Sequence, residues 1–299
     1  MPEGELADQA RLKYAEEVRR DPSNLYFCTR LLERGYMLYG VADGQELIRR
    51  AALTVYKFDP LAYVTTFPHA TGMLAEADLE ELTAALVVDG NEDATNFLRG
   101  KLWSDAARGH ESGERYARRG LEFLRKVPEA TAAAEPDYFG ALAYCCLLAD
   151  YPAYKALARR LVDSREPEWR GHELIQILET AACHADWETY EAWRAEWDQL
   201  PVNAHLCECT FNSLYTFDGL RDLEREELAE LPALLRKAVD VRGCPHLNSG
   251  AARMQLVEKL IEREVLSEES LAYLDACEAF CADDKRIGPL REKLGRPAA

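Results

Sequence analysis

The stretches LLADYPAY at residues 147–154 and CHADWETY at residues 183–190 decide the fold class that the sequence predicts. Each contains Ala-Asp followed by an aromatic residue, with a tyrosine four residues after the aspartate. A third stretch, AEADLEEL at residues 75–82, has leucine at both of those positions. The aspartates are 72 and 36 residues apart, a spacing that predicts repeating helical hairpins with a unit of about 36 residues.

The pattern of apolar residues predicts an all-α protein. Apolar side chains recur at i, i+3, i+4 and i+7 in most windows, whereas strict alternation is rare. We expect the clearest hairpins at residues 92–126, 138–162 and 170–198. Further helices are expected at about 203–217, 223–240, 247–263 and 267–282. The fold prediction is therefore one irregular helical-hairpin array, a single domain over residues 1–299 with irregular ends.

Aspartates and tyrosines mark the expected hairpin turns. We predict Asp78, Asp150 and Asp186 as N-caps, because a short acidic side chain accepts hydrogen bonds from the free N–H groups of a first helical turn. Tyr154 and Tyr190, and Tyr116 in the earlier hairpin, stand at equivalent positions early in the second helices.

Composition limits the class of protein. Apolar residues make up 48% of the chain and charged residues 30%, and the longest apolar run is far shorter than the ~20 residues that span a bilayer. The N-terminus has no basic stretch followed by an apolar one, so we expect no signal peptide. Nine cysteines, an odd number scattered through apolar segments, favour a reducing compartment. We therefore expect a cytoplasmic protein.

The net charge of −17 is concentrated in two acidic blocks. Residues 58–98 and residues 171–220 each carry a local charge of −8, and the only Lys or Arg within them is Arg194. An acidic protein disfavours nucleic acid and anionic membrane surfaces as partners and favours a basic protein or peptide. The alternative is that these carboxylates simply coat solvent-facing helix surfaces.

A shared acidic surface is the predicted partner site. Equivalent positions of successive repeats stack on one face of a solenoid, so acidic residues of neighbouring units add to one field. Trp193 belongs to an aromatic stripe on one predicted helix, formed with Trp187, Tyr190 and Trp197. Such a stripe usually packs in the core. If Trp193 is exposed among carboxylates, it would suit a Lys or Arg side chain. The predicted partner-binding residues are Glu80, Glu81, Asp89, Glu92, Asp93, Glu188, Glu191 and Trp193.

His205, Cys207 and Cys209 are the weak candidates for a metal site. Imidazole and thiolate groups are zinc ligands, but on a helix only the first and the third of these residues would share a face. Buried or surface thiols are the competing interpretation. A metal-dependent or Cys/His enzyme centred on these residues is the alternative function from a different class.

Motifs of common enzyme classes are absent from the sequence. It has no P-loop, no Gly-x-Gly-x-x-Gly fingerprint, no Gly-x-Ser-x-Gly elbow and no His-Glu-x-x-His pair. We therefore expect neither catalytic residues nor a cofactor, and interpret the protein as a non-enzyme.

The hairpins of 34–38 residues, with Tyr116, Tyr154 and Tyr190 early in their second helices, resemble the tetratricopeptide-like helical repeat superfamily. The resemblance covers about residues 75–200 and implies a TPR-like α-α superhelix with a ligand-binding concave face. The family's Trp-x-x-Leu-Gly-x-x-Tyr pattern is missing.

The hairpin at residues 136–150, together with size and acidity, resembles helical immunity proteins of bacterial polymorphic-toxin systems. This resemblance implies an inhibitor that captures a basic toxin. A regulatory scaffold for a peptide or small ligand is a further alternative.

Overall fold

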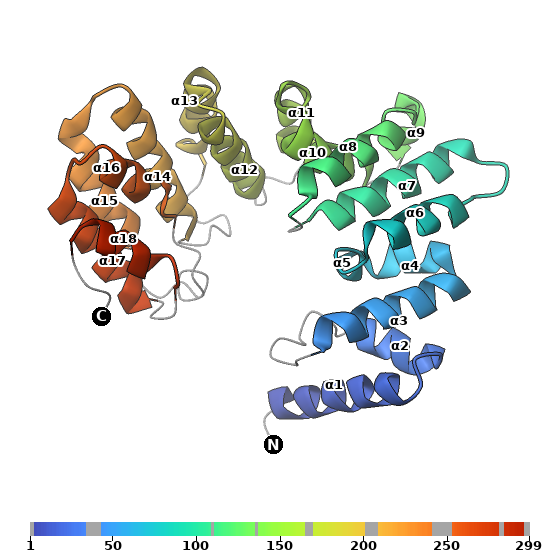
Figure 1. Cartoon of the computed structure of the whole chain (residues 1–299). Coiled ribbons are helices and arrows are strands. Elements are labelled where there is room, and N and C mark those ends of the chain that lie inside the picture. The colour runs from blue at the N-terminus through green and yellow to red at the C-terminus, as the bar shows by residue number, and fades with distance from the viewer. Residues whose placement is uncertain are drawn as a thin grey trace. The chain divides into compact units, whose positions relative to one another are not determined.

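The computed structural model describes residues 3–33, 43–108, 111–134, 137–164, 170–200, 209–240, 253–280 and 284–295. Within these ranges all regular secondary structure is helical, which confirms the all-α prediction (Figure 1). The chain divides into two compact units, Met1–Leu157 and Ala158–Ala299, and each is described by itself. The single domain over residues 1–299 stays a prediction.

The first unit is a succession of short and medium helices. They are α1 (Glu3–Arg20), α2 (Leu25–Leu32), α3 (Gly44–Phe58), α4 (Pro60–Thr66), α5 (Pro68–Thr71), α6 (Glu76–Ala85), α7 (Glu92–Ala107), α8 (Gly113–Leu124), α9 (Glu129–Ala134) and α10 (Tyr138–Ala149). Helix α11 (Tyr151–Ser164) begins in this unit and continues into the second.

The second unit continues with a hairpin and then with helices of varied length. They are α12 (Arg170–Cys183), α13 (Trp187–Trp197), α14 (Cys209–Glu224), the 3₁₀ turn Leu228–Glu230, α15 (Leu231–Val239), α16 (Gln255–Glu262), α17 (Ser267–Phe280) and α18 (Ile287–Lys293). In the described part of the chain, no helix is both long enough and apolar enough to cross a membrane.

Trp103 of α7 is at the centre of the first unit's core, with 1% of its surface exposed. Its Nε1 donates a hydrogen bond to Thr83 Oγ1 on α6 at 2.9 Å, and Thr83 Oγ1 donates to the Leu79 carbonyl at 2.6 Å. The indole ring meets the ring of Tyr116 on α8 edge-on, with 5.3 Å between ring centroids. The burial of one large side chain thus joins three helices while its polar atom stays satisfied.

Asn212 of α14 organises the core of the second unit. Its Nδ2 donates to the Ala238 carbonyl at 2.7 Å and to Tyr273 Oη at 3.1 Å, and its Oδ1 accepts from the Arg253 N–H at 2.9 Å. Tyr273 Oη in turn donates to the Arg253 carbonyl at 2.6 Å. This buried polar group therefore fixes α14 against α15 and α17, with leucines packed around it.

Two of the three predicted aspartate N-caps are present. Asp186 accepts a hydrogen bond from the Thr189 N–H, and Asp150 accepts one from the Ala153 N–H, each at 3.2 Å. Before Asp186 the chain leaves α12 through Ala185, whose φ of 52° lies in the left-handed region. The Asp186 N–H closes that turn on the Ala181 carbonyl at 2.9 Å.

The N-cap prediction for Asp78 is wrong. Helix α6 begins one turn earlier than expected, with Ala75 at the N-cap, so Asp78 is the third helical residue. Its carboxylate accepts a hydrogen bond from the Ala75 N–H at 3.0 Å. This is one of the two hydrogen bonds of a capping box, the one in which the side chain at N3 accepts from the backbone N–H of the N-cap residue.

Two predicted helices also have different bounds in the second unit. The helix expected at 203–217 corresponds to α14, which is described from Cys209 and continues to Glu224, while residues 203–208 lie outside the described residues. Instead of one helix at 223–240, a turn and a 3₁₀ segment precede α15, and Pro232 stands in the first turn of that helix. Proline is favoured there because the first helical N–H groups have no intrahelical acceptor.

Ion pairs and hydrogen bonds of side chains recur at separations close to the period seen in the sequence. Glu76 and Glu80 of α6 pair with Arg115 and Arg119 of α8, each pair 39 residues apart, so the two helices run in the same direction. Other contacts lie 37 or 38 residues apart: Ser104 with Ala141, Asp93 with Thr131, Arg159 with Glu196, and Trp187 with Glu224.

Gly100 of α7 is a position where helix packing leaves no room for a side chain. A Cβ atom there would lie 2.4 Å from Leu124 Cγ and 3.2 Å from the Gly120 carbonyl. We expect Gly100→Ala to lower the free energy of unfolding by about 1–3 kcal/mol, since overpacking outweighs the better helix propensity of alanine. Urea unfolding measures the change.

Gly140 of α10 is the matched control. A Cβ atom there has nothing within 4 Å, so Gly140→Ala should raise the free energy of unfolding by about 0.5–1 kcal/mol. Equal effects of the two substitutions would contradict the close approach of α7 and α8.

Candidate functional site

Three of the eight carboxylates in the first acidic block form ion pairs with arginines from outside it. The ion pairs are Glu76 with Arg115 at 2.5 Å, Asp78 with Arg49 at 2.9 Å, and Glu80 with Arg119 at 3.1 Å. Glu80, a predicted partner-binding residue, is thus already engaged within the chain. The pairs could not be found by counting charge along the sequence, because the arginines lie 29–39 residues away.

Three predicted residues of that block keep unpaired carboxylates. Glu81, Asp89 and Glu92 are exposed, and none forms an ion pair with another residue of the described ranges. Val87 lies between them in the chain and is 63% exposed, one of the most exposed large apolar side chains. We call Glu81, Val87, Asp89 and Glu92 the acidic turn. Asp93, at its edge, is half-buried and accepts a hydrogen bond from Thr131 at 3.0 Å.

Several carboxylates of the second acidic block also form ion pairs, with arginines within and beyond the block. Its carboxylates pair as follows: Glu179 with Arg253 at 2.8 Å, Glu191 with Arg225 at 2.7 Å, Glu196 with Arg159 at 2.7 Å, and Asp218 with Arg194 at 3.4 Å. Of the predicted residues on α13, Glu188 is exposed and has no ion pair with another described residue. The two blocks belong to different units, so one shared groove stays a prediction.

Trp193 is packed inside the second unit. Only 9% of its surface is exposed, and Tyr190 and Trp197 on the same helix are buried with it. The guanidinium of Arg159 lies over the indole, 4.3 Å from the ring centroid, and both of its terminal nitrogens donate to Glu196. The aromatic face that the sequence prediction assigned to a partner's cation therefore holds a cation of the chain itself.

This burial predicts that Trp193 contributes to stability. We expect Trp193→Ala to lower the free energy of unfolding by about 3–5 kcal/mol, because a large side chain leaves a cavity. Glu188→Ala, an exposed position on the same helix, should change it by less than about 0.5 kcal/mol. Urea unfolding would contradict the buried placement if the two variants were equally stable.

The predicted metal ligands lie at the edge of what the structure describes. His205 and Cys207 lie outside the described residues, and Cys209 begins α14 without a described side chain. Among the described residues, no group of three His, Cys, Asp or Glu side chains is arranged to hold a metal ion. The metal-dependent alternative therefore stays a prediction.

Asp105 of α7 is a buried carboxylate of the first unit, and it pairs with a lysine. Lys101 Nζ lies 2.7 Å from it, and both side chains are little exposed. Burial raises the pKa of Asp105, while the charges of Lys101 and Arg108 act in the opposite direction. Such pKa shifts also occur in structural ion pairs. Asp105 does not line the pocket between α8 and the α10–α11 junction, nor the pocket between α15 and α17. We therefore interpret this pair as structural.

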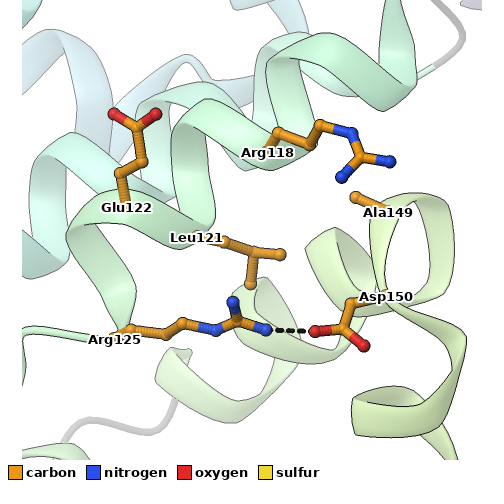
Figure 2. Close-up of a pocket in the computed structure, with 6 residues that line it drawn as sticks. All are labelled: Arg118, Leu121, Glu122, Arg125, Ala149 and Asp150. Atoms are coloured by element: carbon orange, nitrogen blue, oxygen red, sulfur yellow. Dashed lines mark hydrogen bonds and ion pairs between the residues drawn. The ribbon is translucent and has the colours of Figure 1, made fainter.

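A pocket of about 250 Å³ lies where α8 faces the junction of α10 and α11 (Figure 2). Arg118, Leu121, Glu122 and Arg125 line it from α8, and Ala149 and Asp150 line it from the other side. Figure 2 shows the two guanidiniums on either side of Leu121.

The four charged groups of this pocket already have partners. Arg125 pairs with Asp150, Arg118 pairs with Glu114 at 2.6 Å, and Glu122 pairs with Arg119. The pocket therefore presents little net charge to an ionic ligand.

Asp150, the repeated aspartate, is both an N-cap and one half of an ion pair. The hydrogen bond from Arg125, the Ala153 N–H and the nearby charge of Arg118 lower the pKa of its carboxyl group. A lowered pKa in the folded state stabilises the fold above the ordinary carboxyl pKa. This contribution is lost as pH falls through the folded-state pKa.

Two substitutions separate these roles. Asp150→Ala should cost about 1–2 kcal/mol at pH 7, because it removes the cap and the ion pair. Asp150→Asn keeps a capping oxygen and should cost less than about 1 kcal/mol, as expected for a solvent-exposed pair. The deficit of Asp150→Asn should vanish in urea unfolding at acidic pH, below the folded-state pKa. A deficit independent of pH would contradict the ion-pair role.

Comparison of the chain with protein-family models, curated proteins and solved structures finds no match.

Proposed function

We propose that the chain is a protein-binding helical-repeat protein that captures a basic protein or peptide. The observation that carries the proposal is the acidic turn. Its three carboxylates have no ion pair among the described residues, whereas the neighbouring carboxylates on α6 are neutralised by arginines. Val87, which lies between these residues in the chain, exposes an apolar side chain. Free negative charge around an apolar contact suits a cationic protein surface.

A TPR-like array is the architecture that we propose for this role. Its support is the recurrence of contacts 37–39 residues apart in both units. Helices in equivalent positions of such an array display their side chains on one continuous surface.

Pockets of the size of one side chain are compatible with a protein partner. Two pockets lined by described residues measure about 250 and 260 Å³. Each accommodates one anchoring side chain, and a few such anchors dominate the energy of most interfaces.

The sharpest form of the proposal is an immunity-type inhibitor that neutralises a basic toxin in the cytoplasm of a bacterium. An inhibitor of this kind benefits from electrostatic steering, which raises association rates at low salt. The described cysteines Cys28, Cys145, Cys146, Cys183 and Cys277 are free thiols, in keeping with a reducing compartment. In this role the protein acts by binding and not by catalysis.

A charge-reversal experiment tests the acidic turn. The wild-type protein would first be used to capture partners from lysate at low salt, with elution by a salt gradient. For a basic protein recovered in this way, the variant Glu81→Lys, Asp89→Lys, Glu92→Lys should associate about tenfold more slowly and with a flatter dependence on salt. Stopped-flow kinetics measures both quantities.

The matched control reverses three exposed carboxylates of the second unit, Glu227, Glu258 and Glu264, and thus changes the net charge equally. An equal loss of association rate in both variants would mean that net charge alone steers the partner. An unchanged rate in the acidic-turn variant, or no basic partner at any salt concentration, would overturn the proposal.

A further inference from the structure

A second pocket, of about 260 Å³, lies between α15 and α17 of the second unit. Its apolar wall is formed by Pro232, Leu235 and Val239 on α15, and by Ala272 and the ring of Tyr273 on α17. Leu235 and Tyr273 are buried core residues, so the back of the pocket is continuous with the core of the unit. Packing of α15 against α17 thus holds the wall in place before any ligand arrives.

The rim of this pocket carries charge of both signs. Arg236 stands on the α15 side, and Glu268 and Glu269 stand on the α17 side. None of the three forms an ion pair with another residue of the described ranges. The two glutamates lie in the first turn of α17.

The state of these charges separates this pocket from the one in Figure 2. There the guanidiniums and carboxylates of the lining are paired with each other or with neighbours, so a charged ligand would first have to break an ion pair. At the α15–α17 pocket a ligand meets an apolar wall and three charges that are exposed or half-exposed and available. A ligand can contact an unpaired charge without breaking an existing ion pair.

We propose that the α15–α17 pocket is an anchor site for a protein partner. The ligand is a large apolar side chain, next to a lysine or arginine that contacts Glu268 and Glu269. The apolar wall selects the anchor, and the excess of two carboxylates over one guanidinium on the rim selects a cationic neighbour. The volume accommodates one such side chain. This inference rests on the proposed function in one respect, which is that the anchor belongs to the same basic partner.

Methyl NMR of the full-length protein with a defined peptide tests the site. The probe is the peptide Gly-Lys-Phe-Lys-Gly with an acetylated N-terminus and an amidated C-terminus. We expect it to shift the methyl resonances of Leu235, Val239 and Ala272 in a saturable way. Replacement of its phenylalanine by alanine should weaken binding about tenfold or more, because the anchor burial is lost. Replacement of both lysines by glutamate should also weaken it.

A pocket-filling variant provides the matched pair. Ala272 is exposed on the pocket wall, and Ala279 is exposed on the same helix away from the pocket. Ala272→Phe should abolish the saturable shifts of Leu235 and Val239, while Ala279→Phe should bind the peptide as the wild type does. Both variants add the same apolar surface to α17, so a difference between them reports the pocket alone.

Several outcomes would overturn the inference. These are no shift with the phenylalanine peptide, equal shifts with the alanine peptide, or equal binding by the two variants. Shifts of the same methyl groups that grow with protein concentration alone would identify a second copy of the chain as the occupant. The peptide result is distinguishable from failure of the proposed function, because reversal of the acidic turn should leave peptide binding to this pocket unchanged.

Discussion

The close approach of α7 and α8 is the constraint on which the arrangement of the first unit depends. At Gly100 and Gly120 neither helix has room for a Cβ atom without a shift of its neighbour. This approach lets Trp103 reach both Thr83 on α6 and Tyr116 on α8 from one helix. The helices of the hairpin are therefore positioned by packing, and their exposed ion pairs add little net stability.

The periodic part of the fold could be predicted from the sequence. Asp150, Asp186 and the buried tyrosines recur because each helical hairpin needs a cap at its turn and an apolar contact in its second helix. Helix α13 has the bounds that its cap and its aromatic stripe predict. Asp78 did not follow the rule, because the same residue type is favoured at N3 as well as at the N-cap, and sequence alone did not distinguish the two positions.

The candidate site could be predicted only in part, because the charge on a surface is set by neighbours in space. Each acidic block has a charge of −8 when read along the chain, yet Glu80 and Glu191 are neutralised by Arg119 and Arg225 from other helices. The recurring separation of 37–39 residues could have supplied part of this information, since it places Glu80 beside Arg119. The α15–α17 pocket had no sequence signal, because its lining comes from two segments without shared spacing.

The proposed recognition surfaces of this protein rest on free charge and not on total charge. A paired carboxylate attracts a cation only weakly, because the field of its arginine largely cancels its own. An exposed, unpaired carboxylate keeps its attraction over about a Debye length and can guide a partner before contact. The acidic turn and the rim of the α15–α17 pocket share this property, and each also has apolar surface beside it. Charge brings a partner close and apolar burial holds it, so the two features together are what an interface requires.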